Sequence, residues 1–196
     1  MKKVWKISVC AALIAMILTG FAALGILKYS DLAASDAMYQ SRSTPDGEIV
    51  LVGIDQRAIE EIGPYEQWGR DVMATVLDTL NESEECHPAA IALDILYTSE
   101  RDAGTDEWLA EAAGKYGNVV TAGAARFGTS MTEEENGEYG LDTFSVLEFE
   151  EPYEALAKAT TRGHINVMLD GTDGVLRHHL LSFSLADGTE VPSLAL

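Results

Sequence analysis

The chain has 196 residues, 47% of them hydrophobic, and its 32 acidic residues outnumber 13 Lys and Arg residues, for a formal net charge of −19 at pH 7. Such an acidic chain repels phosphate backbones, so we expect no nucleic-acid binding, and its field favours cations or basic partners. Its cysteines are Cys10, in an apolar N-terminal segment, and Cys86, so a disulfide framework within the remaining chain is excluded.

The N-terminal segment predicts a membrane helix. Residues 7–27 contain no charged side chain, and a helix of this length spans about 31 Å, which matches a hydrocarbon core of about 30 Å. Three lysines, Lys2, Lys3 and Lys6, precede the segment and only Lys28 follows it. The positive-inside rule therefore predicts a cytoplasmic N-terminus, a lipid bilayer around residues 7–27, and residues 29–196 outside the plasma membrane. A cleaved signal peptide is the alternative, but its apolar region is usually about 7 to 15 residues long.

The helix is predicted to continue beyond the membrane. No Gly or Pro occurs between Gly25 and Pro45, so residues 4–42 are expected to form one rod of about 58 Å. The predicted organisation is a cytoplasmic tip and transmembrane helix over residues 1–28, an extension of that helix over 29–44, and one domain over 45–196. Nine of the 13 basic residues and all 32 acidic residues follow Lys28, so residues 29–196 carry a formal charge of −23.

Beyond Pro45, apolar strand patterns alternate with amphipathic helix patterns. Strands are predicted at "EIVLVGI" (48–54), "PAAIALDILY" (88–97) and "NVVTAGAA" (118–125), and helices at "WGRDVMATVLDTLNES" (68–83) and "DEWLAEAAGKYG" (106–117). This alternation predicts a three-layer α/β domain with a mostly parallel sheet. Residues 127–140 have no apolar period and are expected to form an exposed loop. Two Asp-Gly signals in residues 164–191 predict a C-terminal antiparallel hairpin.

Motifs for catalysis and metal binding are incomplete. "GAARFGTS" (123–130) resembles a phosphate-binding loop, but Thr129 occupies the position of the essential lysine. "DGTDG" (170–174) lacks the alternating acids and the distal glutamate of a calcium loop. His178 and His179 are adjacent, so on a strand they face opposite sides and cannot share a metal. We therefore expect neither catalytic residues, nor a metal, nor a cofactor.

Charged residues at predicted strand ends are the candidate ligand contacts. Asp55 follows the first predicted strand and Asp94 lies in the second, so both approach the carboxyl edge of a parallel sheet, where such folds bind ligands. Arg70 and Arg177 are positioned to neutralise them. The alternative is that Asp55 only caps its helix and that the arginines form structural ion pairs.

The order of segments resembles a known family. An apolar helix is followed by "IVLVGID", "IGPYEQWGRDVMATVLDTL", "AIALDILY", "GNVVTAGAA", "GHINVMLDGTDGVLR" and "VPSLAL", and this order is similar to that of the second class of CHASE-type domains. These are extracytoplasmic sensory domains of bacterial receptors. The family usually has an aromatic-Pro-aromatic-Pro-Arg run before the long helix, and here Trp68 and Arg70 are what remains of it.

The resemblance implies a sensory function. It adds Trp68, and Asp173 of the Asp-Gly turn, to the candidate ligand-binding residues. It implies an unknown extracellular ligand, a C-terminally truncated domain, and a following cytoplasmic output enzyme through which the receptor forms a homodimer. An adenylate or guanylate cyclase is the expected output, and a histidine kinase, diguanylate cyclase or protein kinase is the alternative. A membrane-anchored extracellular hydrolase and a structural or assembly protein are alternatives from other functional classes.

Overall fold

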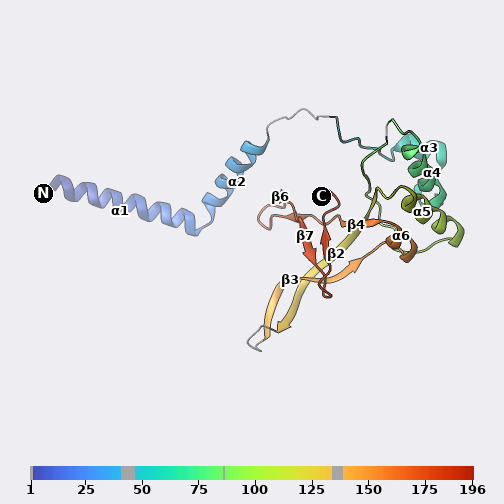
Figure 1. Cartoon of the computed structure of the whole chain (residues 1–196). Coiled ribbons are helices and arrows are strands. Elements are labelled where there is room, and N and C mark those ends of the chain that lie inside the picture. The colour runs from blue at the N-terminus through green and yellow to red at the C-terminus, as the bar shows by residue number, and fades with distance from the viewer. Residues whose placement is uncertain (1, 41–46, 86, 134–138) are drawn as a thin grey trace. The chain divides into compact units, whose positions relative to one another are not determined.

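The computed structural model describes residues 2–40, 47–85, 87–133 and 139–196 of the chain, which divides into two compact units, Met1–Gly53 and Ile54–Leu196. Figure 1 shows the first unit as two helices and the second as a mixed α/β unit.

The first unit contains α1 (Lys2–Ala23) and α2 (Ile26–Tyr39). Within α1, the segment Val4–Ala23 has a mean hydropathy of 2.0 and is, within the described residues, the one helix long and apolar enough to cross a membrane. Its side chains are not buried by protein, and large ones such as Trp5 and Met16 are 70% and 69% exposed. A row of apolar side chains without protein partners is typical of a helix that lies in lipid.

The prediction of one unbroken rod over residues 4–42 is wrong. Gly25 has φ of 70°, in the left-handed region, and separates α1 from α2. Its N–H donates to the carbonyl of Ala22 at 3.0 Å, which closes the last turn of α1, and its own carbonyl accepts from Lys28 N at 3.1 Å. Glycine takes this conformation without the steric cost of a Cβ, so it ends one helix and begins the next. Residues 41 and 42 of the predicted rod lie outside the described residues.

The prediction of a strand over residues 48–54 is also wrong. These residues form no strand, and Ile49, Val50 and Leu51 are 91%, 79% and 94% exposed. The apolar, β-branched composition favours an extended backbone, but a strand also needs a neighbour with free N–H and C=O groups. No described strand pairs with this segment.

The helices of the second unit are α3 (Gln56–Ile62), the short 3-10 helix η1 (Tyr65–Gln67), α4 (Arg70–Asn81), α5 (Ala103–Tyr116) and α6 (Glu154–Ala159). The helices expected over residues 68–83 and 106–117 are thus confirmed as α4 and α5. The Asp102 side chain caps α5 by accepting from Thr105 N at 3.0 Å, and Gly117, with φ of 67°, ends it.

The sheet consists of β1 (Ile91–Leu93), β2 (Val119–Glu133), β3 (Tyr139–Glu150) and β4 (Thr161–His164). The first part of β2 pairs in parallel with β1 and with β4, and its later part pairs with β3 in antiparallel register. Figure 1 shows β2 and β3 as a long ribbon. The mixed α/β fold with parallel pairing is therefore confirmed. The prediction of an exposed loop over residues 127–140 is wrong for residues 127–133 and 139–140, which lie in β2 and β3; residues 134–138 lie outside the described part of the chain. We call residues 124–133 and 139–150 the β2–β3 ribbon.

Two antiparallel hairpins follow, where the sequence pattern predicted one. The first joins β5 (Met168–Leu169) to β6 (Leu176–His178), and the second joins β7 (Ser182–Ser184) to β8 (Glu190–Pro192). Gly174 and Gly188 have φ of 73° and 83° at their turns, a conformation that favours glycine.

The hydrophobic core lies where α4, α5 and α6 pack with β1 and the start of β2. Leu77, Leu109 and Leu156, one from each helix, are fully buried. Burying each of these side chains stabilises the fold by about 1.5 to 3 kcal/mol. The cluster comprises Ala74, Leu77, Leu93, Tyr97, Leu109, Ala112, Ala113, Val119, Tyr153 and Leu156.

Candidate functional site

Two of the predicted site residues, Trp68 in the loop before α4 and Arg70 at the start of α4, lie close together in the chain. The Trp68 Nε1–H donates to the carbonyl of Gly63 at 2.7 Å, and the Trp68 ring meets Tyr65 edge-on, with centroids 5.4 Å apart. Gly63 has φ of 108°, which favours glycine where the chain leaves α3. The indole is therefore held against its own loop, directly before Arg70 begins α4.

Arg70 is buried, and its charge is compensated inside the protein. Its Nε donates to Asp106 Oδ1 at 3.0 Å, and the two side chains are 7% and 5% exposed. Its Nη2 donates to the carbonyl of Ser99 at 2.7 Å. The guanidinium carbon also lies 4.3 Å from the ring centroid of Tyr97 and 5.2 Å from that of Tyr153, within the range of a cation–π contact.

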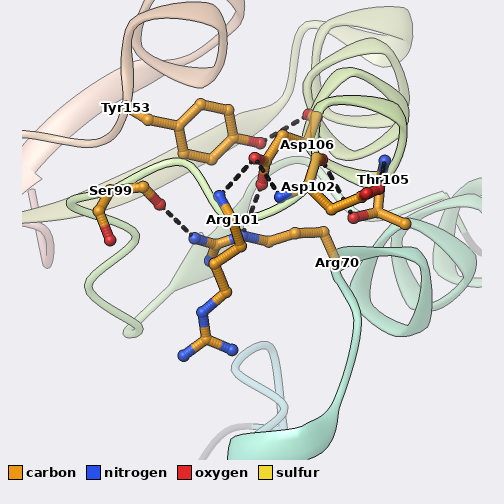
Figure 2. A network of polar contacts seen from close by, with 7 residues as sticks. All are labelled: Arg70, Ser99, Arg101, Asp102, Thr105, Asp106 and Tyr153. Atoms are coloured by element: carbon orange, nitrogen blue, oxygen red, sulfur yellow. Dashed lines mark hydrogen bonds and ion pairs between the residues drawn. The ribbon is translucent and has the colours of Figure 1, made fainter.

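Asp106, in the first turn of α5, completes the network in Figure 2. Its Oδ2 accepts from the backbone N–H groups of Arg101 and Asp102 at 2.7 and 3.0 Å, while its own carbonyl accepts from the Tyr153 hydroxyl at 2.7 Å. Burial, and then the nearby Asp106 carboxylate, raise the pKa of Tyr153 to about 12, so the phenol remains a donor at neutral pH. The network ties α4, α5 and the segment before α6 together, and we call it the Arg70 brace.

A small hollow lies beside the brace. It is lined by Tyr65, Trp68, Gly69, Arg70, Val72, Met73, Tyr97 and Arg101, and its volume is about 20 Å³. This volume accommodates about one water molecule, far below the roughly 300 to 1,000 Å³ of ordinary ligand pockets. The structure thus brings the predicted residues Trp68 and Arg70 to one place, and the geometry there is that of a brace.

The other predicted site residues lie elsewhere in the fold. Asp55 caps α3, because its Oδ1 accepts from Ala58 N at 3.0 Å, and the ion partner of Arg70 is Asp106 rather than Asp55. Asp94 is exposed just after β1. At the β5–β6 turn, Asp173 accepts from Arg177 at 2.8 and 2.7 Å, and this paired hydrogen bonding lowers the pKa of Asp173 to about 2. The second carboxylate on Arg177 is Asp170, at 3.6 Å.

A larger groove lies between the β2–β3 ribbon and β7, and it was missed from the sequence. Its volume is about 510 Å³, and its lining residues are Phe127, Ser130, Asp142, Phe144, Ser145, Val146, Ser182, Phe183, Ser184, Leu185 and Ala186. Two of these residues, Phe127 and Ser130, fall in the stretch predicted as a loop. The available signal was the alternation of apolar and polar residues in Phe144-Ser145-Val146 and again in Leu147-Glu148-Phe149-Glu150, because alternation is the period of a strand.

A comparison with family models matches residues 10–196 to the CHASE2 domain. The match begins inside α1 and continues through the whole α/β unit, so it includes the larger part of the apolar helix as well as the folded domain. Comparisons with curated proteins and with solved structures gave no match.

Proposed function

Because the chain belongs to the CHASE2 family, whose members are sensory domains of signal-transduction receptors, we propose that it is the extracytoplasmic input module of a membrane-bound bacterial receptor. The observation that carries the proposal is the single family match that covers most of the apolar helix and the whole α/β unit. A sensory domain of this kind is not itself catalytic.

The proposed topology places α1 in the plasma membrane and residues 29–196 outside the cytoplasm. The support is the lysine asymmetry around the apolar segment, with Lys2, Lys3 and Lys6 before it and only Lys28 after it. Without added protein partners, the exposed apolar surface of Val4–Ala23 is stable only in lipid or detergent.

A maleimide that cannot cross membranes tests this topology. In a chain whose native cysteines are replaced by alanine, Glu111→Cys places a thiol on the exposed face of α5. We expect the thiol to react in intact cells, whereas a cysteine in an N-terminal tag should react only after lysis. The reverse pattern would overturn the topology.

The proposed partner inside the cell is an output enzyme, an adenylate or guanylate cyclase, with a histidine kinase, diguanylate cyclase or protein kinase as the alternative. We propose that the receptor forms a homodimer through this output. A sensor acts by having different free energies in two receptor arrangements, with coupling of commonly about 1 to 3 kcal/mol.

The experiment measures output from the full receptor in membranes. Asp106→Asn weakens the Arg70 brace, so it should change receptor output in the membrane, while the separately expressed output domain keeps its activity. The control Glu148→Gln removes an exposed ion pair on β3 and should leave the output unchanged. Unchanged output from both variants, at equal receptor levels, would contradict the sensory function.

A further inference from the structure

The groove between the β2–β3 ribbon and β7 has the size of a small-molecule site. Its volume of about 510 Å³ lies inside the usual range of roughly 300 to 1,000 Å³. All its lining residues belong to one compact unit, and none belongs to the hydrophobic core cluster.

One part of the groove is aromatic. The rings of Phe127 and Phe144 stack with centroids 4.5 Å apart and planes within 9°, and Phe183 meets Phe127 edge-on at 5.4 Å. Phe183 is buried, whereas Phe144 is 42% exposed. An exposed phenyl group at the groove offers apolar contact to a ligand and a negative ring face to a cation.

Another part carries an oriented carboxylate. Asp142 Oδ2 accepts from the Ser145 hydroxyl at 2.6 Å, and Oδ1 accepts from Phe144 N at 2.9 Å. The Ser130 hydroxyl donates in turn to Ser145 at 2.5 Å. The Ser145 hydrogen bond, and then that from Phe144 N, lower the pKa of Asp142, so the group is charged at neutral pH.

This carboxylate has no basic partner within the described residues. Asp142 forms no ion pair there, although Glu148 on the same strand pairs with Arg126 at 2.9 Å. The sequence contains no Lys or Arg from Phe127 to Ala157. A formal charge of −23 on residues 29–196 adds a field that attracts cations and repels anions.

We propose that this groove binds a small amphipathic cation, with its ammonium or guanidinium group on Asp142 and its apolar part against Phe144 and Phe127. The inference rests on the proposed sensory function in one respect, namely that the bound cation is the signal. The rings of Phe127 and Phe144 provide affinity, because binding buries apolar area against them. The Asp142 carboxylate, held in place by its hydrogen bonds, selects ligands with a positive charge.

Three probes of nearly equal size test the charge selection. Phenethylammonium, the neutral phenethyl alcohol and the anionic phenylpropionate are titrated by calorimetry into the full chain in nanodiscs of zwitterionic lipid, with empty nanodiscs subtracted. We expect saturable binding of the ammonium probe, at least about tenfold weaker binding of the alcohol, and no binding of the carboxylate. Equal binding of the ammonium and the alcohol would overturn the proposal, as would the lack of saturable ammonium binding.

Matched variants then locate the binding. Asp142→Asn should weaken phenethylammonium binding by at least about tenfold, and Phe144→Ala should weaken both the ammonium and the alcohol. Glu150→Gln removes one negative charge from the exposed end of the same strand, outside the groove, and should leave affinity nearly unchanged. Equal losses of affinity from Asp142→Asn and Glu150→Gln would show that the overall negative charge of the domain attracts the probe, and would overturn the groove as the site.

Two further outcomes separate this inference from the proposed function. Binding with the expected selectivity, but without any change in output of the full receptor, would contradict the signalling role and leave the groove as a binding site. A concentration-dependent dimer that covers Phe144 and excludes the probe would assign the groove to a second copy and would overturn the inference, while the sensory function would stand.

Discussion

Breaking the Arg70 brace should destabilise the α/β unit far more than breaking an exposed ion pair. Asp106→Asn removes the counter-charge of Arg70, whose side chain is 7% exposed, and leaves a positive charge among Tyr97 and Tyr153. Removing one partner of a buried pair costs about 3 to 5 kcal/mol. This is a large fraction of the roughly 5 to 15 kcal/mol by which domains are stable.

The control is the ion pair between Arg126 and Glu148, which has nearly the same length of 2.9 Å but side chains that are 64% and 57% exposed. Glu148→Gln should cost no more than about 1 kcal/mol, because solvent screens both charges. For a domain of about 150 residues, the Asp106→Asn loss corresponds to a fall in Tm of roughly 6 to 20 °C, against a few degrees for the control.

The assay is urea unfolding of the full chain in nanodiscs, followed by the fluorescence of Trp68 and Trp108 in a Trp5→Phe background. A double-mutant cycle adds Arg70→Gln to Asp106→Asn. We expect the double variant to lose about 2 kcal/mol less than the sum of the single losses, since the second change removes the charge that the first leaves unpaired. Additivity to within about 0.5 kcal/mol, or an Asp106→Asn loss equal to that of the control, would refute the reasoning.

Gly25→Ala should join α1 and α2 into one helix, because alanine is strained at φ of 70° and is about 1 kcal/mol better than glycine within a helix. Distances between spin labels in α1 and α2 should then rise to those of a straight helix, and unchanged distances would contradict this. Gly163→Ala should lower the free energy of unfolding by about 1 to 3 kcal/mol, because the new Cβ would lie 2.6 Å from Leu194 Cα. The control is Gly104→Ala, whose Cβ would have its nearest contact at 3.6 Å and which should not destabilise the domain. Equal unfolding midpoints for these two variants would show that the packing of Gly163 in β4 against Leu194 leaves room for a Cβ. His164 is 1% exposed, neither ring nitrogen has a hydrogen-bond partner in the described structure, and burial lowers its pKa, so the neutral ring is favoured in the folded state. The unfolded chain then binds the proton more readily, so the free energy of unfolding should fall as pH drops below about 6.5. His164→Leu should therefore flatten the dependence of Tm on pH between about 7.5 and 5.5. If the Tm profiles of the variant and the wild type run parallel, this histidine does not cause the pH dependence.

The parts of the fold that follow from the sequence are those set by local signals. The C-terminal end of α5 is marked by Gly117, as predicted, whereas the helix begins at Ala103, three residues before the predicted start at Asp106. The Asp-Gly turns of the two hairpins follow from the same local logic, because a positive φ is easiest for glycine.

The parts that do not follow depend on partners distant in the chain. Residues 48–54 have strand composition, but whether they pair depends on a neighbouring strand edge that local sequence does not specify. Likewise, the brace joins Arg70 to Asp106, 36 positions away, whereas the sequence pattern predicted Asp55 and Asp94 as the acids near the arginines. The groove was hidden because polar and acidic residues in the 127–140 stretch mask the two-residue period of the ribbon.

The separation of the β2–β3 ribbon from the hydrophobic core has an evolutionary consequence. The core cluster contains no residue between Ala124 and Glu150, and β2 is fixed by parallel pairing only through Gly123. Substitutions at groove positions such as Phe144 or Ser130 therefore change the lining of the proposed binding site without removing contacts that hold α4, α5 and α6 together. If the groove binds the proposed cation, its ligand preference can therefore change through substitutions that leave the hydrophobic core intact, so preference can evolve faster than the fold.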